Sequence, residues 1–234
     1  MSSNENFVLS NGETVPVIIE TRRGARNVTL RPKVTPQFEI HISKPYMTST
    51  AFVMKFIESK RKWIEKIFAN APKKEHLKSG TIIEFLGRDV EIIHDPQMRG
   101  NKYKDSDKTK LYIGGGADMF ERRVRDFVRN EFMETAKEII HTTPREFWPR
   151  RISLRDTTSR WGSCSSNRNI SLSWRLAFAP YDVMRYVIMH ELAHQKHMDH
   201  SREFWATVSQ LYGFGVERAK RWLAQNGATL HKYF

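Results

Sequence analysis

Residues 190–200, with the sequence HELAHQKHMDH, hold four of the chain's nine histidines and begin with the pattern H-E-x-x-H. On a helix, positions four apart lie on the same face and about 6 Å apart along the axis, so His190 and His194 can bind one cation together. Glu191 lies beside the first histidine, where it can reach a metal-bound water without being a ligand itself. This segment therefore predicts a metal site with a carboxylate next to it.

Two histidines are candidates for the third ligand. His197 continues the same stripe of an unbroken helix, but side chains from three successive turns point nearly parallel and do not converge on an ion at ~2.0–2.1 Å. His200 can converge if the helix ends near His197, which would then take the left-handed turn position that favours glycine. We favour His200 as the ligand. His197 and Asp199 are then candidates for orienting an imidazole by hydrogen bonding.

Three neutral imidazoles and one water form an open zinc site of the catalytic type, so we expect one Zn²⁺ per chain. Zinc lowers the pKa of its bound water toward neutrality. Glu191 can accept the proton of that water as it attacks an electrophilic carbon or phosphorus. The residues thus predict metal-assisted hydrolysis, and they do not by themselves determine which electrophile is attacked.

The helix that must carry these residues is predicted independently of the motif. Pro180 suits the first position of a helix, and Asp182 is favourable near its positively polarised N-terminal end. Residues that can be buried follow at Val187, Ile188, Met189, Leu192 and Ala193. Such a helix would hold the metal-binding histidines on a rigid, packed element.

The other elements are predicted from hydrophobic periodicity. Expected strands lie at 15–20, 27–32, 37–43, 81–87, 88–95, 151–156 and 169–176, with exposed loops at 98–110 and 157–168. Expected helices lie at 48–70 and 118–142 and begin near Tyr181, Ser201 and Val216. The pattern predicts an α+β fold: an antiparallel β-rich N-terminal part with two long helices, then a helical C-terminal domain with a small sheet. We expect the domains to be residues 1–115 and 116–234.

The composition is typical of a folded protein, with 39% hydrophobic residues to form a core. No apolar run approaches the roughly 20 residues of a membrane-spanning helix, and the N-terminus lacks the apolar segment of a signal peptide. We therefore expect a cytoplasmic protein without a membrane partner. The single cysteine, Cys164, excludes an intrachain disulfide and a cysteine-based metal site. We interpret it as a small hydrophobic residue, the alternative being a thiol close to the metal.

The net charge of +13, from 39 Lys and Arg against 26 Asp and Glu, is spread over the chain, with +7 in residues 1–150 and +6 in residues 151–234. Such a charge favours anionic partners, including nucleic acid, nucleotides and acidic peptides. A solvated basic surface without a specific partner explains the same composition. The charge alone therefore does not identify the function.

Residues 155–205 resemble the YgjP-like metallopeptidase family, whose relatives are the SprT and WLM zincins. The matching pieces are RWGSC at 160–164, NISLSWRL at 169–176, Pro180, HELAH at 190–194 and HSREFW at 200–205. The resemblance extends to RRGARNVTLRP and KRKWI in the N-terminal half. It implies a zincin-type C-terminal domain with His190, His194 and His200 as ligands and Glu191 as catalytic base. It also implies that strand 169–176 is an edge strand to which an extended peptide substrate adds.

Three functions follow as hypotheses. The first is a zinc peptidase that acts on a protein or peptide. The second is a metal-dependent nucleoside-triphosphate pyrophosphatase, an activity that the resemblance also implies, and the third is a basic module associated with nucleic acid. Arg160 is a candidate contact for a substrate carboxylate or phosphate, or alternatively an ion-pair partner of Asp156.

Overall fold

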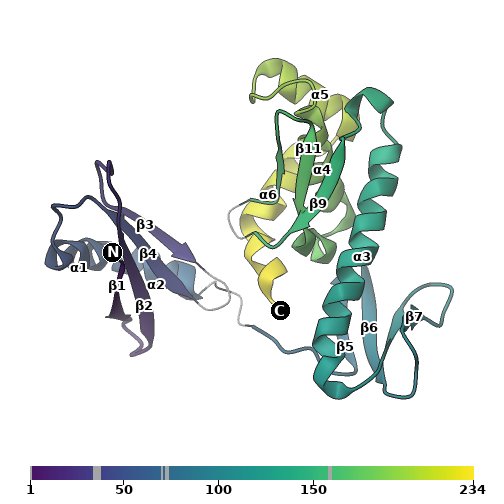
Figure 1. Cartoon of the computed structure of the whole chain (residues 1–234), viewed down its shortest axis with the longest axis horizontal. Coiled ribbons are helices and arrows are strands. Elements are labelled where there is room, and N and C mark those ends of the chain that lie inside the picture. Colours follow the sequence, from purple (N-terminus) through teal and green to yellow (C-terminus); the bar gives the residue numbers. More distant parts are fainter. Residues whose placement is uncertain (1, 34–37, 70, 72–73, 158–159) are drawn as a thin grey trace. The chain divides into compact units, whose positions relative to one another are not determined.

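The computed structural model describes residues 2–33, 38–69, 71, 74–157 and 160–234. The chain forms two compact units, residues 1–74 and residues 75–234 (Figure 1). Both units combine sheets with helices, so the predicted α+β class is confirmed. The domain boundary predicted at residue 115 is corrected to residue 74, because the strands that begin at Thr81 bury their apolar side chains in the same core as the C-terminal helices.

The first unit is a four-stranded sheet that shares its core with two helices. Its elements are β1 (Ser2–Val8), β2 (Thr14–Thr21), β3 (Thr29–Lys33), β4 (Glu39–Lys44), α1 (Thr50–Ser59) and α2 (Arg61–Ala69). The strand order is β1-β2-β4-β3, with a parallel β2–β4 pair and two antiparallel pairs. Alternate residues of β2 are buried, as the period of a half-buried strand requires.

One helix was predicted at 48–70, and the structure has two. Ser49 caps α1, because its side chain accepts a hydrogen bond from the backbone N–H of Phe52 at 3.2 Å. Lys60 then leaves the helical conformation, with φ −104° and ψ 6°, before α2 begins. Apolar periodicity alone does not reveal this break, because the buried Ile57 and Ile64 lie on both sides of it.

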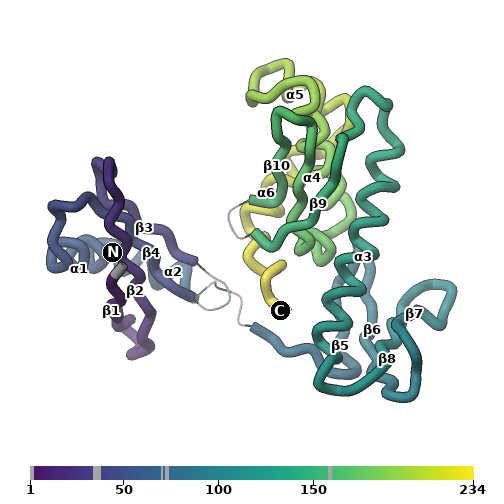
Figure 2. Tube along the Cα trace, viewed as in Figure 1, coloured from purple at the N-terminus to yellow at the C-terminus, as the bar shows by residue number. Residues whose placement is uncertain are grey.

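The second unit begins with a four-stranded sheet against which a long helix packs. Its elements are β5 (Thr81–Phe85), β6 (Arg88–Asp95), β7 (Asn101–Tyr103), β8 (Lys110–Gly114) and α3 (Phe120–His141). The order is β5-β6-β8-β7, so the predicted loop at 98–110 contains an additional edge strand. Helix α3 extends from this sheet to the C-terminal elements (Figure 2). It thereby joins both parts of the unit into one hydrophobic core.

A second, three-stranded sheet lies next to the site. Its strands are β9 (Arg151–Arg155), β10 (Gly162–Cys164) and β11 (Asn169–Ser173), in the order β10-β11-β9. Strand β11 is therefore central and not the edge strand that was predicted. The predicted loop 157–168 contains β10, which pairs with β11 and takes the edge position. Three residues are too few to show a strand period in the sequence, which explains the error.

Three helices complete the unit: α4 (Tyr181–Ala193), α5 (Arg202–Tyr212) and α6 (Val216–Asn226). Helix α4 contacts α3, α5, α6 and both β10 and β11, and most of its residues are buried. None of the helices in the described ranges is long and apolar enough to cross a membrane. Packing of α4 against these helices and strands therefore holds its last turn, where the H-E-x-x-H residues lie.

Candidate metal centre

The three histidines favoured as ligands come together at the end of α4. One ring nitrogen each from His190, His194 and His200 lies within 4.8 Å of the other two. The Nε2 atoms of His190 and His200 are 3.2 Å apart. Two nitrogens that share a tetrahedral zinc ion at ~2.0–2.1 Å are about 3.4 Å apart, so this spacing fits a shared ion. The donor set fits zinc, which imidazole suits well.

A turn after α4 returns the chain to the face that carries His190 and His194. The backbone N–H groups of Gln195, Lys196 and His197 bond to the carbonyls of Leu192 and Ala193, which closes the end of the helix. His197 is not among the described residues with a positive φ, so the left-handed conformation predicted for it is wrong. The chain reverses through these tight backbone bonds and does not need the conformation that glycine favours.

Two capping interactions place His200 at the start of the next helix. Ser201 is the N-cap of α5, and its hydroxyl accepts a hydrogen bond from the N–H of Phe204 at 3.3 Å. Asp199 accepts a hydrogen bond from the N–H of Ser201 at 3.3 Å. Asp199 thus shapes the backbone beside His200, and among the described residues its carboxylate makes no hydrogen bond to an imidazole; its charge acts on His194 and His197 electrostatically only.

The orientation of His194 is set by a backbone group. Its Nδ1–H donates to the carbonyl of His197 at 2.8 Å, which leaves Nε2 free to face the site. The contribution of His197 therefore comes from its main chain, whereas the sequence suggested a role for its side chain. Among the described residues, the group of clustered donors does not include the His197 ring.

A phenylalanine packs against all three imidazoles. The ring of Phe204, which is fully buried, has its centroid 4.9 Å from that of His190, 4.5 Å from His194 and 4.7 Å from His200. Trp205 adds contacts to His190 and His200. These aromatic walls limit how the imidazoles can turn and exclude water from one side of the site.

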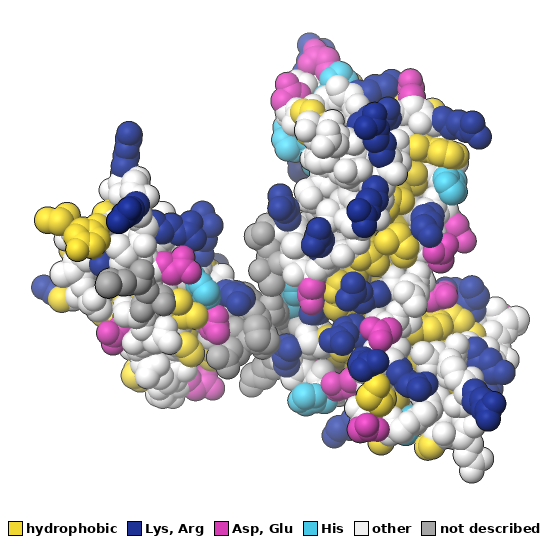
Figure 3. All heavy atoms as spheres, in the orientation of Figure 1, with side chains coloured by type: hydrophobic (Ala, Val, Ile, Leu, Met, Phe, Trp, Pro, Cys, Tyr) yellow, Lys and Arg dark blue, Asp and Glu magenta, His cyan; other side chains and the backbone are white. Residues whose placement is uncertain are grey.

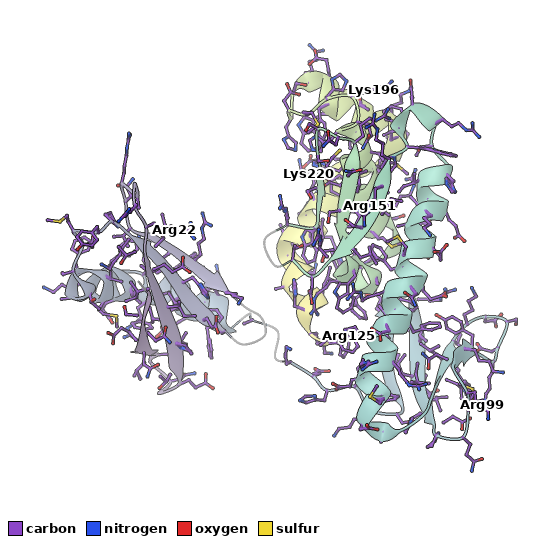
Figure 4. All side chains as sticks on the ribbon, in the orientation of Figure 1. Arg22, Arg99, Arg125, Arg151, Lys196 and Lys220 are labelled. Carbon is purple, nitrogen blue, oxygen red and sulfur yellow. The ribbon has the colours of Figure 1, made fainter. Side chains whose placement is uncertain are left out.

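Burial keeps His190 and His194 in the neutral form, which is the form of imidazole that binds metal. Burial lowers the pKa of His190 to about 4, with further lowering by His194, His200 and Lys220. Burial also lowers the pKa of His194. Lys220 lies on α6 with its ammonium 4.5 Å from the centroid of the Trp205 ring (Figure 4). Near neutral pH the imidazoles of His190 and His194 therefore offer lone pairs and not positive charges.

The carboxylate of Glu191 is buried, with 5% of the residue exposed. Burial raises its pKa to about 7, and the positive charge of Arg160 opposes the rise. Its Oε2 atom has no hydrogen-bond partner among the described residues. A buried carboxyl group without a partner is costly to folding, and such groups are concentrated at functional sites.

Gly162 of β10 lies directly against this carboxylate. A Cβ atom at Gly162 would be 2.5 Å from Oε1 of Glu191, a distance that real Cβ atoms do not adopt. Glycine is thus needed so that the edge strand and the carboxylate can lie side by side. Sequence reasoning did not assign Gly162 a role, because the contact joins residues far apart in the chain.

A polar network joins the edge strand to the end of α4. Gln195 donates from Nε2 to the sulfur of Cys164 at 3.2 Å and accepts from Nε of Arg168 at 2.8 Å. Burial, with the negative charge of Glu191 as a second cause, raises the pKa of the Cys164 thiol to about 11. Cys164 is thus neutral and packs against the core, as predicted, while its thiol also takes part in a hydrogen bond.

Arg160 is exposed and lies just before β10. The alternative pairing with Asp156 does not occur, because Arg175 holds that carboxylate with Nε 2.8 Å from Oδ1. Arg175 is 4% exposed and also donates to the carbonyls of Tyr233 and Phe234. Sequence reasoning overlooked Arg175, since nothing local indicates that a C-terminal segment supplies its partners.

Residues 26–226 match the family model described as YgjP-like, metallopeptidase domain. Among the curated proteins compared, none matches the chain. A solved structure, the metallopeptidase zymogen of Pyrococcus abyssi abylysin, is 24% identical over 45% of this chain and 98% of that chain. Its TM-score of 0.32 is too low to support a conclusion about this chain. The family match covers most of the sequence and includes every residue of the histidine cluster, so the chain belongs to the YgjP-like metallopeptidase family.

Proposed function

We propose that the chain is a zinc-dependent peptidase in which His190, His194 and His200 hold one zinc ion and Glu191 is the general base. The observation that carries this proposal is the convergence of three imidazole nitrogens beside a buried carboxylate that has no other partner. Neutral imidazoles suit a divalent cation, and three of them leave a coordination position for water or substrate. A carboxyl group with a pKa near 7 can both accept and return a proton at neutral pH.

When bound, zinc supplies the positive charge that acidifies water and polarises the scissile carbonyl. Glu191 accepts the proton of the attacking water at a carboxylate oxygen as the C–O bond forms. It then delivers that proton to the amide nitrogen, which leaves as the amine when the C–N bond breaks. His194 is held in one tautomer by the carbonyl of His197, so its Nε2 lone pair remains directed at the site.

Strand β10 is the proposed place for the substrate backbone. It forms the edge of its sheet, and its Gly162 contacts Glu191. An extended peptide that adds to this edge gains main-chain hydrogen bonds and lies beside the catalytic carboxylate. The peptide-binding edge inferred from the sequence is therefore moved from residues 169–176 to β10.

The proposed function is tested with one set of incubations. Zinc-loaded and metal-free protein are each mixed with an unfolded protein and, separately, with nucleoside triphosphates. We expect about one zinc per chain by metal analysis and cleavage of the unfolded protein only by the zinc-loaded form. Release of pyrophosphate while the unfolded protein stays intact would contradict the peptidase proposal in favour of nucleotide hydrolysis.

The positive charge of the surface does not distinguish a peptidase from a nucleotide hydrolase. On the face shown in Figure 3, lysine and arginine side chains lie along α3 and beside the small sheet. Arg125 of α3 and Arg151 of β9 are two of them (Figure 4). The chain shows no nucleotide-binding motif in its sequence, and positive charge alone attracts any anion.

The contact between Gly162 and Glu191 leads to a specific prediction. Gly162→Ala should displace the Glu191 carboxylate and lower kcat by about tenfold to hundredfold, since misplacing a catalytic group by about 1 Å has effects of this size. The φ of Gly162 is not in the left-handed region, so alanine adds the collision without backbone strain. Zinc content should not change. Ser163→Ala, one residue along the same strand, is the control, and equal activity of both variants would argue against the contact.

A further inference from the structure

We propose that Arg160 is a substrate-binding residue that holds a carboxylate of the peptide next to the bond that is cleaved. The proposal rests on the peptidase function above and specifies the chemistry that its substrate carries. The carboxylate belongs either to an Asp or Glu side chain or to the free C-terminus of the peptide.

The position of Arg160 places it at the entrance of the proposed substrate-binding edge. The carbonyl of Trp161 accepts a hydrogen bond from the N–H of Ser173 at 2.8 Å, so the pairing of β10 with β11 continues toward Arg160. Two residues further on, Gly162 contacts Glu191. The hydroxyl of Thr157 donates to the carbonyl of Arg160 at 2.8 Å. Hydrogen bonds to its own carbonyl and to the next carbonyl therefore fix the backbone of Arg160 where it enters β10, two residues from the contact between Gly162 and Glu191.

The guanidinium of Arg160 is not used to hold the protein together. Arg168 donates to the side chain of Gln195 and to backbone carbonyls, and Arg175 binds Asp156 and the C-terminal carbonyls. Arg160, in the same stretch of chain, is exposed, and its guanidinium makes no hydrogen bond or ion pair with another residue that the structure describes. The main chain of Arg160 is thus fixed by hydrogen bonds while its guanidinium is left available, so this side chain can bind a ligand.

Glu191, the nearby acidic residue, does not form an ion pair with the guanidinium of Arg160. Its carboxyl group is buried, and its Oε2 atom accepts no hydrogen bond from a described residue. Arg160 is near enough to act on that group electrostatically but does not pair with it. The planar fork of a guanidinium matches a carboxylate in a bidentate arrangement, which lysine or a neutral side chain does not reproduce.

The test uses zinc-loaded protein and a series of fluorogenic peptides of one sequence. Glu replaces Gln at each position near the scissile bond in turn, and each peptide is made with a free and an amidated C-terminus. We expect kcat/KM to rise about tenfold for the peptides that place a carboxylate at Arg160, the range of a charge-assisted hydrogen bond. The Glu series and the amidated series show whether that carboxylate is a side chain or a chain terminus.

The variants assign the preference to the side chain. Arg160→Gln should abolish the preference while it leaves zinc content and thermal stability unchanged. Arg160→Glu should reverse it toward peptides with Lys at the same position, a result that a merely structural role would not produce. Arg155→Gln is the matched control, because Arg155 is an exposed arginine on β9, the opposite edge of the same sheet.

Three results overturn the proposal. Cleavage of all peptides without a preference for a carboxylate contradicts the role of Arg160 and leaves the peptidase function in place. A preference that persists in Arg160→Gln also contradicts it. If zinc-loaded protein cleaves none of the peptides, the peptidase proposal fails, and this inference fails with it.

Discussion

Glu191→Gln should lower kcat by about 10²–10⁴-fold while the protein keeps about one zinc per chain. Glutamine preserves the size of the side chain but cannot accept the proton of the attacking water. Because Glu191 lies outside the histidine cluster, its replacement leaves the donor set intact. The measurement is peptide cleavage at saturating substrate together with metal analysis of the same preparation. Full turnover by the variant would exclude Glu191 as the base.

The same substitution should also stabilise the metal-free protein at neutral pH. An acid whose folded pKa, about 7, exceeds its usual value of 4.5 binds its proton more tightly in the folded state. The stability of the wild type therefore falls as the pH rises from about 4.5 to 7, whereas the glutamine variant does not lose this contribution. At pH 8 the variant should be more stable by about 3 kcal/mol, and at pH 4 the difference should vanish.

Urea unfolding of chelator-treated protein at both pH values measures this effect. Glu138→Gln on α3 is the control, because Glu138 is exposed and its replacement relieves no burial. An equal gain in both variants would show that loss of a negative charge on a basic protein causes the stabilisation. If Glu191→Gln does not increase the free energy of unfolding at pH 8, then ionisation of Glu191 does not destabilise the folded protein.

The second large effect is expected at His200, the proposed third ligand. His200→Ala should weaken zinc binding by at least about hundredfold, because removal of a direct ligand exceeds the 10–100-fold cost of losing a group that only orients one. His200 is exposed, so its truncation should cost little folding free energy. Competition with a chromophoric chelator measures the affinity, and far-ultraviolet circular dichroism checks that the variant is folded.

His197→Ala is the matched control, three residues earlier in the same turn. Its backbone carbonyl, which accepts from Nδ1 of His194, is still present in alanine. Zinc affinity should therefore change little. Loss of zinc in His197→Ala together with full affinity in His200→Ala would transfer the ligand role to His197.

The clustered histidines of the candidate metal centre could be predicted because they lie close together in the sequence. H-E-x-x-H depends on the period of one helix, and the apolar residues of α4 predicted that helix separately. His200 could be favoured over His197 by a geometric argument about straight helices. The way the chain turns could not be predicted. A left-handed conformation was expected at His197, but the chain turns through backbone hydrogen bonds at the end of α4 and His197 does not adopt it.

Taken alone, the sequence determined the fold class, the helix that carries the site and a set of histidines able to bind a divalent ion. Tertiary structure decided which strand forms the edge, that Gly162 lies against Glu191, and that Phe204 packs under all three imidazoles. It also decided that Arg175, and not Arg160, holds Asp156. Periodicity within one segment indicates which face of a helix or strand is buried. Pairing between distant segments depends on how the whole core packs, and therefore cannot be predicted from the residue spacing within any one of them.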